Sequence, residues 1–208
     1  MSGKFITLEG GEGVGKSTQA RRLAEALRGR GLEVVLTREP GGTPGAEVIR
    51  TVLMEGDADR WSTRGEALLF AAARADHVER LIAPSLERGA WVVCDRFVDS
   101  TRAYQGLASG MSDADIMELH RIGSGGLLPD RTFLLHMSLE GASMRVLQRD
   151  GAGADRFAMR DVAFFDGVAE AFADLAAAEP ERFRVVHAGG SEAEVTESLV
   201  TSLVDLLP

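Results

Sequence analysis

The sequence is poor in cysteine, lysine and long apolar runs, and each shortage limits what the chain can be. Its 208 residues include one cysteine, Cys94, so no disulfide can form within the chain, as is typical of reducing compartments. No apolar run approaches the roughly 20 residues that cross a bilayer. The chain also enters a β-prone segment at once, without a charged-then-apolar leader. We therefore expect a soluble cytoplasmic protein with no membrane partner.

Positive charge is scarce as well. The net charge is −9 and the isoelectric point is about 5.0, which argues against broad binding to nucleic acid. The 23 basic residues include only two lysines, Lys4 and Lys16, and the remaining 21 are arginine. Because arginine and lysine are not interchangeable at a phosphate site, this bias draws attention to Lys16.

Lys16 belongs to the segment Gly10–Ser17, which fits the phosphate-binding pattern G-x-x-x-x-G-K-[ST]. An apolar segment precedes it and a helical pattern follows it, so the required strand–loop–helix context is present. Glycines let backbone N–H groups curl around an anion, and the helix N-terminus favours negative charge. The alternative is a glycine-rich turn without a ligand. We expect a nucleotide to be held by Gly10, Gly11, Glu12, Gly13, Val14, Gly15, Lys16, Ser17 and Thr18.

Apolar runs alternate with helical stretches along the whole chain, which is typical of βαβ units around a parallel sheet. With 45% hydrophobic residues and no linker, the sequence predicts one α/β domain over residues 1–208. The expected strands are Phe5–Glu9, Glu33–Thr37, Trp91–Asp95, Thr132–Met137 and Arg184–His187.

Helical patterns fill the intervals between these strands. We expect Pro84 to bend or interrupt the longest helix. Ser112 and Ser191 are candidate N-caps, because an acidic residue follows each of them three positions later. The expected helices are Gly15–Gly29, Gly45–Glu55, Thr63–Arg88, Ser112–Ile122, Leu139–Asp150, Asp161–Ala178 and Ser191–Leu206.

Two motifs follow the second and third expected strands, where ligands bind in open α/β sheets. Thr37–Thr43 reads TREPGGT, and the alternative for it is an ordinary strand-to-helix turn. In Asp95-Arg96-Phe97, the aspartate follows four apolar residues and can hold Mg²⁺, together with Ser17 of the phosphate loop. Arg96 can bridge phosphates with its planar fork. The alternative is a surface Asp–Arg pair.

Other segments carry groups suited to a flat heterocycle and a sugar. Phe70 and Arg74 share one helical face, although a helical phenylalanine is more often part of the core. Ser100–Gly106 contains hydroxyls, an amide and the only tyrosine, and the alternative is a polar loop anchored by that tyrosine.

A cluster of arginines lies late in the chain, around a glycine-rich segment. We expect residues 148–160 to form a mobile lid that closes over the transferring phosphate. The alternative is a solvated charged loop. Its arginines are Arg145, Arg149, Arg156 and Arg160.

Together these motifs resemble the thymidylate kinase family of the nucleoside-monophosphate kinases, over nearly the whole chain. The phosphate loop is shared by many enzymes, and the more specific signal is REPGGT together with Asp95-Arg96 and the Tyr104-Gln105-Gly106 that follows. The resemblance implies a three-layer α/β/α fold with a five-stranded parallel sheet in the order 2-3-1-4-5. It also implies Mg²⁺-dependent transfer of the ATP γ-phosphate to dTMP, giving dTDP and ADP in dTTP synthesis.

The resemblance also implies roles for single residues. Phe70 stacks on thymine and Arg74 bonds its edge, while Tyr104 crowds the sugar 2′ position. The remaining acceptor-site residues are Glu39, Pro40, Arg50, Arg96, Ser100, Thr101 and Gln105. The catalytic residues are Lys16, Arg96, Glu12, Arg149 and Arg156. Because position 13 is glycine, the last two supply the catalytic arginine from the lid, as in the common bacterial type.

Two other functions remain open at this point. The acceptor could be another nucleoside monophosphate, or the chain could be a non-catalytic nucleotide-binding switch. A guanine-binding switch should carry an Asn-Lys-x-Asp base reader, whereas no lysine occurs after Lys16. By resemblance we also expect a homodimer, in which the long helix Thr63–Arg88 packs against its copy.

Overall fold

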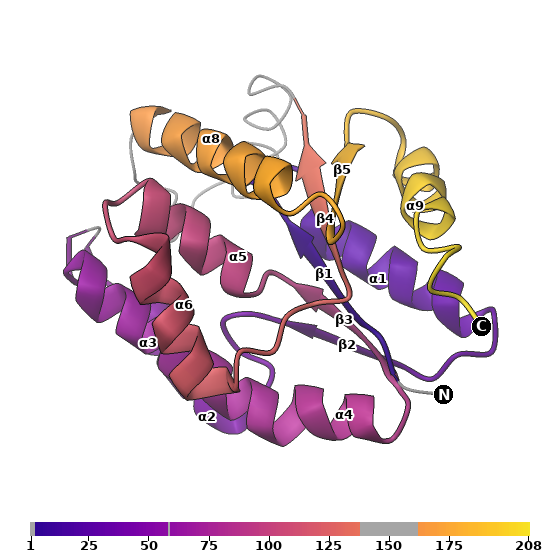
Figure 1. Ribbon diagram of the computed structural model, residues 1–208, viewed down its shortest axis with the longest axis horizontal. Helices are drawn as coiled ribbons and strands as arrows, with labels where there is room; N and C mark the ends of the chain where they lie inside the picture. Colours follow the sequence, from indigo (N-terminus) through magenta and orange to yellow (C-terminus); the bar gives the residue numbers. More distant parts are fainter. Residues whose placement is uncertain (1–2, 58, 138–161) are drawn as a thin grey trace.

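A parallel five-stranded sheet forms the centre of the molecule in the computed structural model, which describes residues 3–57, 59–137 and 162–208 (Figure 1). The strand order is β2-β3-β1-β4-β5, as the family resemblance implies. All pairs are parallel, so the carboxyl ends of the strands lie at one edge. The strands are β1 (Phe5–Glu9), β2 (Val34–Arg38), β3 (Trp91–Asp95), β4 (Arg131–His136) and β5 (Phe183–His187).

The observed strands agree closely with the expected ones. β1 and β3 have the expected bounds, while β2 and β4 are displaced by one residue and β5 begins one residue earlier. β3 is apolar on both faces because both faces are covered: Trp91 and Val93 pack toward α1, and Val92 and Cys94 pack toward the opposite layer.

Helices cover both faces of the sheet. Figure 1 shows α1 (Lys16–Arg28) and α9 (Glu192–Thr201) together on one face, and the other helices on the opposite side. Leu23 and Leu27 of α1 and Leu199 of α9 are fully buried in the first layer. The opposite side holds α2 (Pro44–Met54), α3 (Thr63–His77), α4 (Ala83–Glu87), α5 (Val98–Thr101), α6 (Asp113–Ser124) and α8 (Val162–Ala178).

The long helix is interrupted next to its proline, as expected. After α3, the chain makes a π-helical turn, η1 (Val78–Ile82), and α4 follows with Pro84 in its first turn. Proline has no N–H to donate to the carbonyl four residues earlier, so the regular helical pattern cannot continue through it. The expected caps are also present, since Ser112 and Ser191 each accept a backbone N–H through the side chain.

One alternative is excluded and one expected boundary was wrong. The segment Ser100–Gly106 is not the polar loop that was its alternative, because it lies in α5 and in a second π-helical turn, η2 (Arg102–Leu107). The last helix, α9, ends at Thr201 rather than at Leu206. The expected helix Leu139–Asp150 and the expected lid at 148–160 lie outside the described residues. Among the helices described, none combines the length and apolarity needed to span a membrane.

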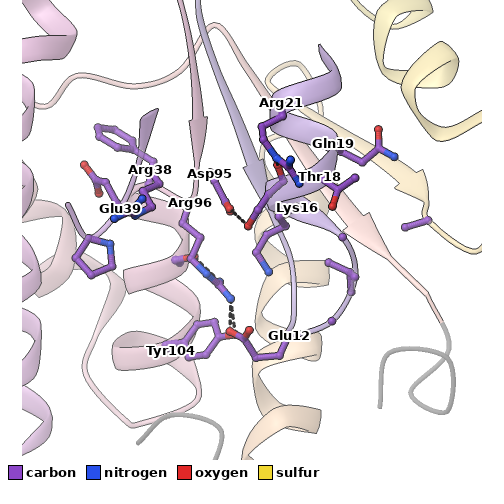
Figure 2. Close-up of a pocket in the computed structure, with 18 of the residues that line it drawn as sticks. Glu12, Lys16, Thr18, Gln19, Arg21, Arg38, Glu39, Asp95, Arg96 and Tyr104 are labelled. Atoms are coloured by element: carbon purple, nitrogen blue, oxygen red, sulfur yellow. Dashed lines mark hydrogen bonds and ion pairs between the residues drawn. The ribbon is translucent and has the colours of Figure 1, made fainter. Parts of the chain in front are cut away.

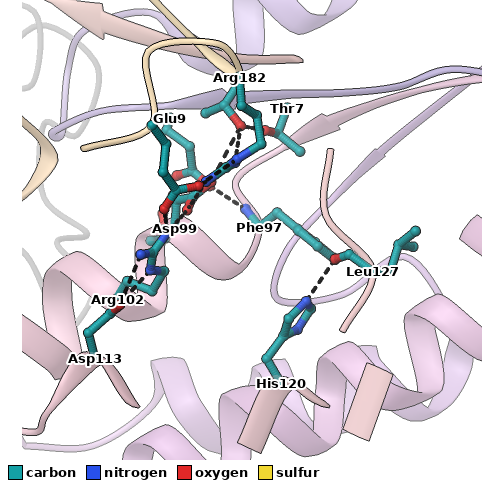
Figure 3. A network of polar contacts seen from close by, with 12 residues as sticks. Thr7, Glu9, Phe97, Asp99, Arg102, Asp113, His120, Leu127 and Arg182 are labelled. Atoms are coloured by element: carbon teal, nitrogen blue, oxygen red, sulfur yellow. Dashed lines mark hydrogen bonds and ion pairs between the residues drawn. The ribbon is translucent and has the colours of Figure 1, made fainter. Parts of the chain in front are cut away.

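A buried ion-pair network joins α5 to the β4–β5 edge of the sheet (Figure 3). The Asp99 carboxylate is fully buried and accepts two hydrogen bonds from Arg182, at 2.7 and 3.0 Å. It also accepts one from Arg102 at 3.1 Å. Arg182 donates further to Thr132 at 2.6 Å. These bonds fix the start of the helical segment that carries Tyr104.

Replacing Asp99 by alanine should destabilise the protein strongly, because it leaves two buried guanidinium groups short of their shared carboxylate. We expect the free energy of unfolding to fall by about 3–5 kcal/mol, as when one partner of a buried ion pair is removed. Urea unfolding followed by circular dichroism measures this change. Glu118→Ala, which breaks the exposed pair with Arg121, is the control and should leave stability nearly unchanged. Equal losses in the two variants would contradict the prediction.

Candidate active site

A pocket of about 660 Å³ opens at the carboxyl edge of the sheet (Figure 2). The loop after β1, the turn after β3 and the ends of β2 and β5 contribute to its walls, as the topology of a parallel sheet requires. Residues of α3 and η2 line it on the side away from α1.

The phosphate loop has the backbone that its glycines allow. Gly10 and Gly15 have φ of +133° and +95°, and Gly15 directly precedes the first turn of α1. Lys16 is buried, and its Nζ donates to the carbonyls of Gly10 at 3.0 Å and Gly11 at 2.6 Å. Burial lowers the pKa of Lys16 to about 8, and the charge of Arg96 lowers it further, while nearby carboxylates oppose the shift. The ammonium is therefore held in a weakly solvated position where an anionic ligand would stabilise its charge.

Asp95 at the end of β3 meets Ser17 at the start of α1. Ser17 Oγ donates to Asp95 Oδ2, and Figure 2 shows this contact beside Lys16. Asp95 Oδ1 is buried and has no hydrogen-bond partner among the described residues. A carboxylate oxygen without a partner beside a hydroxyl is a donor set that Mg²⁺ accepts. Within the described part of the chain, no cluster of three or more His, Cys, Asp or Glu side chains offers an alternative metal site.

Arg96 connects the turn after β3 to the phosphate loop. Its φ of +67° is the only positive value among the described non-glycine residues, which marks a constrained backbone. Its Nη1 donates to Gly10 O at 3.2 Å and to Ser100 Oγ at 2.9 Å. Its Nη2 pairs with Glu12 and donates to Tyr104 Oη at 3.3 Å (Figure 2). Burial raises the pKa of Tyr104 to about 12, so the phenol stays neutral beside the guanidinium.

Glu9, the last residue of β1, supports this turn from beneath. The side chain is fully buried, and its two oxygens accept from Phe97 N at 2.7 Å and from Ser100 Oγ at 2.6 Å. Burial raises the pKa of Glu9 to about 8, and the charge of Asp99 adds to the shift. Glu9 thus holds Phe97 and Ser100, which both follow Arg96 in the chain.

The far end of the pocket is formed by α3 and η2. Phe70 and Arg74 both line it, as their shared helical face predicts. Arg74 is only 2% exposed, and its guanidinium donates to Glu39 at 2.8 Å and to Thr101 at 2.8 Å. An aromatic ring and a buried cationic fork therefore meet at the end of the pocket that lies away from Lys16.

The structure brings nearly all of the described candidate residues to this one pocket. It is lined by Glu12, Gly13, Val14, Gly15, Lys16, Ser17, Thr18, Glu39, Pro40, Arg50, Phe70, Arg74, Asp95, Arg96, Ser100, Thr101, Tyr104 and Gln105. Gly10 and Gly11 do not line it and instead offer their carbonyls to Lys16. Arg149 and Arg156 lie outside the described residues, so their expected roles stay predictions.

Several of these candidates also hold one another. Arg50 donates to the Pro40 carbonyl at 2.9 Å, and Gln105 donates to Glu66 at 2.6 Å. The Glu39 carboxylate faces Arg74 and His77. Part of the expected substrate shell therefore orients other side chains of the site.

Sequence reasoning missed residues on both ends of the pocket. Ala188, Gly190, Glu192 and Val195 line it where the chain leaves β5 and enters α9, a position that the carboxyl-edge rule could have flagged. Gln19, Arg21 and Arg38 also line it. Glu9 and His77 lie behind the pocket wall, and only their tertiary contacts identify them.

Comparison with known proteins agrees with this geometry. The family model "Thymidylate kinase" matches residues 8–199. A thymidylate kinase of Rhizorhabdus wittichii is 62% identical over 208 residues, which cover all of both chains. The chain belongs to the thymidylate kinase family. A thymidylate kinase of Bradyrhizobium sp. is 46% identical over 203 residues, covering 97% of this chain and 89% of the relative.

A solved structure of a thymidylate kinase shares the fold as well. The crystal structure of the enzyme from Ehrlichia chaffeensis matches with a TM-score of 0.78 and 31% identity, covering 98% of this chain and 100% of that one. Thymidylate kinases are phosphotransferases that convert dTMP to dTDP with ATP. A pocket with a phosphate loop at one end and an aromatic–guanidinium pair at the other has the two sites that such a reaction needs.

Glu9 predicts a pH dependence of stability. Its pKa of about 8 in the folded protein exceeds its ordinary 4.5, so the fold favours the protonated side chain. The stability of the protein relative to Glu9→Gln should therefore be greatest at low pH and fall as the pH rises from about 4.5 to about 8. Urea unfolding of both proteins at intervals across this range measures the difference, and parallel curves would contradict the raised pKa.

Proposed function

We propose that this chain transfers the γ-phosphate of ATP to dTMP, giving ADP and dTDP. The observation that carries the proposal is the position of Arg96. Its guanidinium lies between the phosphate loop and Tyr104, so that one cation faces both ends of a single pocket. Phosphoryl transfer depends mainly on positioning and on stabilisation of developing charge, and this pocket supplies both.

The donor end binds ATP through the phosphate loop and the start of α1. Backbone N–H groups of Gly13 and Gly15 face the phosphates, and Lys16 exchanges its bonds to loop carbonyls for bonds to phosphate oxygens. Ser17 and Asp95 would hold Mg²⁺, which supplies positive charge and fixes the phosphate oxygens in place when it is bound. The unpaired oxygen of Asp95 supports this assignment.

The acceptor end binds dTMP. Arg96 and Arg50 neutralise the acceptor phosphate, which is already a nucleophile and needs no strong base. Phe70 stacks on the thymine ring, and Arg74 donates to its edge. Tyr104 lies against the sugar and leaves no room for a 2′-hydroxyl, which favours a deoxyribose. Glu39, Pro40, Ser100, Thr101 and Gln105 complete the walls around these groups.

Two further groups complete the chemistry in this proposal. Glu12 orients Arg96 through their ion pair and faces the reacting phosphates. Arg149 and Arg156 approach the transferring phosphate from the segment 148–160, which acts as a mobile lid. Gly13 supports the assignment of the catalytic arginines to this segment, because the phosphate loop carries no arginine at that position.

We also propose that the protein acts as a homodimer in the cytoplasm. Val48, Leu68 and Ile122 are large apolar side chains that are more than half exposed, and they lie on α2, α3 and α6. Burial of such side chains against a second copy would remove them from water. The single cysteine, which is free and buried, suits a reducing compartment.

An acceptor panel tests the substrate assignment. With ATP and Mg²⁺ present, we expect dTMP to be phosphorylated in preference to dUMP, dCMP and UMP, because of Phe70, Arg74 and Tyr104. ADP formation in a coupled assay measures each rate. A clear preference for dUMP, dCMP or UMP would overturn the acceptor, and tight ADP binding without acceptor-dependent turnover would favour the nucleotide-binding switch.

Alanine at Lys16 or Arg96 should lower kcat by at least about 100-fold, the scale of losing one preorganised charge contact. Steady-state kinetics with dTMP and ATP measure the loss. Near-normal turnover in either variant would contradict the role given to that residue.

The chain provides matched controls for both substitutions. Lys4 is the only other lysine, and it forms a partly exposed pair with Asp130 at the amino end of β1. Arg88 pairs with Glu33 at the surface, also away from the pocket. Lys4→Ala and Arg88→Ala should keep the kinetics of the unaltered protein, so that a loss in the test variants reflects the site and not the removal of a charge as such.

A further inference from the structure

A chain of buried polar contacts runs from the far end of the pocket to His77, which lies behind the pocket wall and has no role in the reaction proposed above. Glu39 follows β2, and its two oxygens have different partners. Oε2 accepts from Nε of Arg74 at 2.8 Å, and Oε1 faces Nδ1 of His77 at 3.0 Å. Glu39, Arg74 and His77 are 6%, 2% and 0% exposed, so water does not compete for these bonds.

The directions of these hydrogen bonds can be assigned from the chemistry of the groups. A carboxylate only accepts, so Nδ1 of His77 carries the proton that faces Glu39. The other ring nitrogen, Nε2, lies 2.7 Å from the hydroxyl of Thr37 in β2. His77 is therefore held at both nitrogens, by the end of β2 on one side and by the residue that follows β2 on the other.

The glycine loop after Glu39 packs against the same histidine. Gly42 has φ of +90°, and a Cβ at this position would meet both the His77 ring and the Thr37 side chain. The loop, the imidazole and the Glu39 carboxylate thus form one packed unit. Arg74 lies three residues before His77 on α3, so both side chains point into this unit from the same helix.

We propose that His77 is a positioning residue that sets the acceptor selectivity of the site, by orienting Glu39 so that this carboxylate aims the guanidinium of Arg74 at the nucleobase. The proposal rests on the role given above to Arg74 as the side chain that bonds the thymine edge. Arg74 also donates to Thr101, and its Cζ lies 5.3 Å from the centre of the Phe97 ring, so its direction is set by three partners. Of these, only Glu39 is an acidic side chain, and it is itself held by a second side chain, His77.

The two amide analogues of histidine test the proposal, because they keep different halves of the ring. Asparagine reaches about as far as Nδ1, and it keeps a donor for Glu39. Glutamine reaches about as far as Nε2, and it keeps a partner for Thr37 while leaving Glu39 without its donor. We expect His77→Gln to raise the KM for dTMP by roughly 10-fold, the effect of one lost buried hydrogen bond to a charged group. In His77→Asn the increase should stay below about three-fold.

The KM for ATP is the internal reference, because the phosphate loop does not contact this unit. It should change by less than about two-fold in both variants. The relative rates with dTMP and dCMP add a second readout, and the preference for dTMP should shrink in His77→Gln. Equal effects of glutamine and asparagine, or a parallel rise in the KM for both substrates, would show that His77 acts only through the fold and would overturn the proposal.

His120 provides a matched control. It is another histidine on the same side of the sheet, 1% exposed, and its Nε2 lies 2.7 Å from the carbonyl of Leu127 (Figure 3). His120→Asn, whose shorter side chain does not reach Leu127, should lower the thermal stability and leave the KM for dTMP unchanged. If His77→Gln does not fold, Thr37→Val removes the partner of Nε2 and should raise the KM for dTMP selectively. An unchanged value in that variant would contradict the proposal.

Arg74→Ala separates this proposal from the function on which it rests. If Arg74→Ala raises the KM for dTMP and His77→Gln does not, the role of Arg74 stands and the role of His77 is overturned. If Arg74→Ala leaves the KM for dTMP unchanged, Arg74 does not bond the thymine edge, and the proposed role of His77 is overturned as well.

Discussion

The hydrogen bonds of the Arg96 guanidinium are the interactions on which the arrangement of this site depends. A parallel sheet brings the carboxyl ends of β1 and β3 side by side, and Arg96 then spans the gap between the phosphate loop and η2. Its backbone adopts an uncommon conformation, which the structure must stabilise from outside. Glu9 does so by binding the N–H of Phe97 and the hydroxyl of Ser100. The donor and acceptor ends of the pocket therefore share one support.

Three buried acidic side chains support the residues of the pocket. Glu9 holds the turn around Arg96, Glu39 holds Arg74, and Asp99 holds the start of the segment that carries Tyr104. A buried carboxylate is costly unless it is paired, so each of these acids restricts the conformations of the groups bound to it. Side chains that are held in place before the substrate binds need not reorganise during the reaction. Their charges can therefore stabilise the transition state more effectively.

The sequence predicted the fold and most of the pocket because both follow from local patterns. β3 is apolar on both faces, and that pattern alone placed Asp95 and Arg96 at the carboxyl edge. The phosphate loop was recognised from the spacing of its glycines, lysine and serine, which few other structures require. The helical form of Ser100–Gly106 was missed, because its polar composition suits a loop and its burial against α8 is a tertiary effect. β2 is displaced by one residue, a difference typical of element boundaries, whereas α9 ends at Thr201, well before the expected Leu206.

What the sequence determined by itself is the chemistry present: a phosphate loop, an Asp–Arg pair after a buried strand, and an aromatic–arginine face on one helix. Each of these motifs consists of residues that are close together in the chain, so its spacing can be recognised from the sequence. The tertiary structure decided which groups are free for substrate and which hold others. Glu39 and Gln105 line the pocket and also bond Arg74 and Glu66, contacts that the sequence did not reveal, while Glu9 and His77 carry no local signal at all. Their partners lie 35 to 91 residues away in the chain, and only folding brings such groups within hydrogen-bond distance.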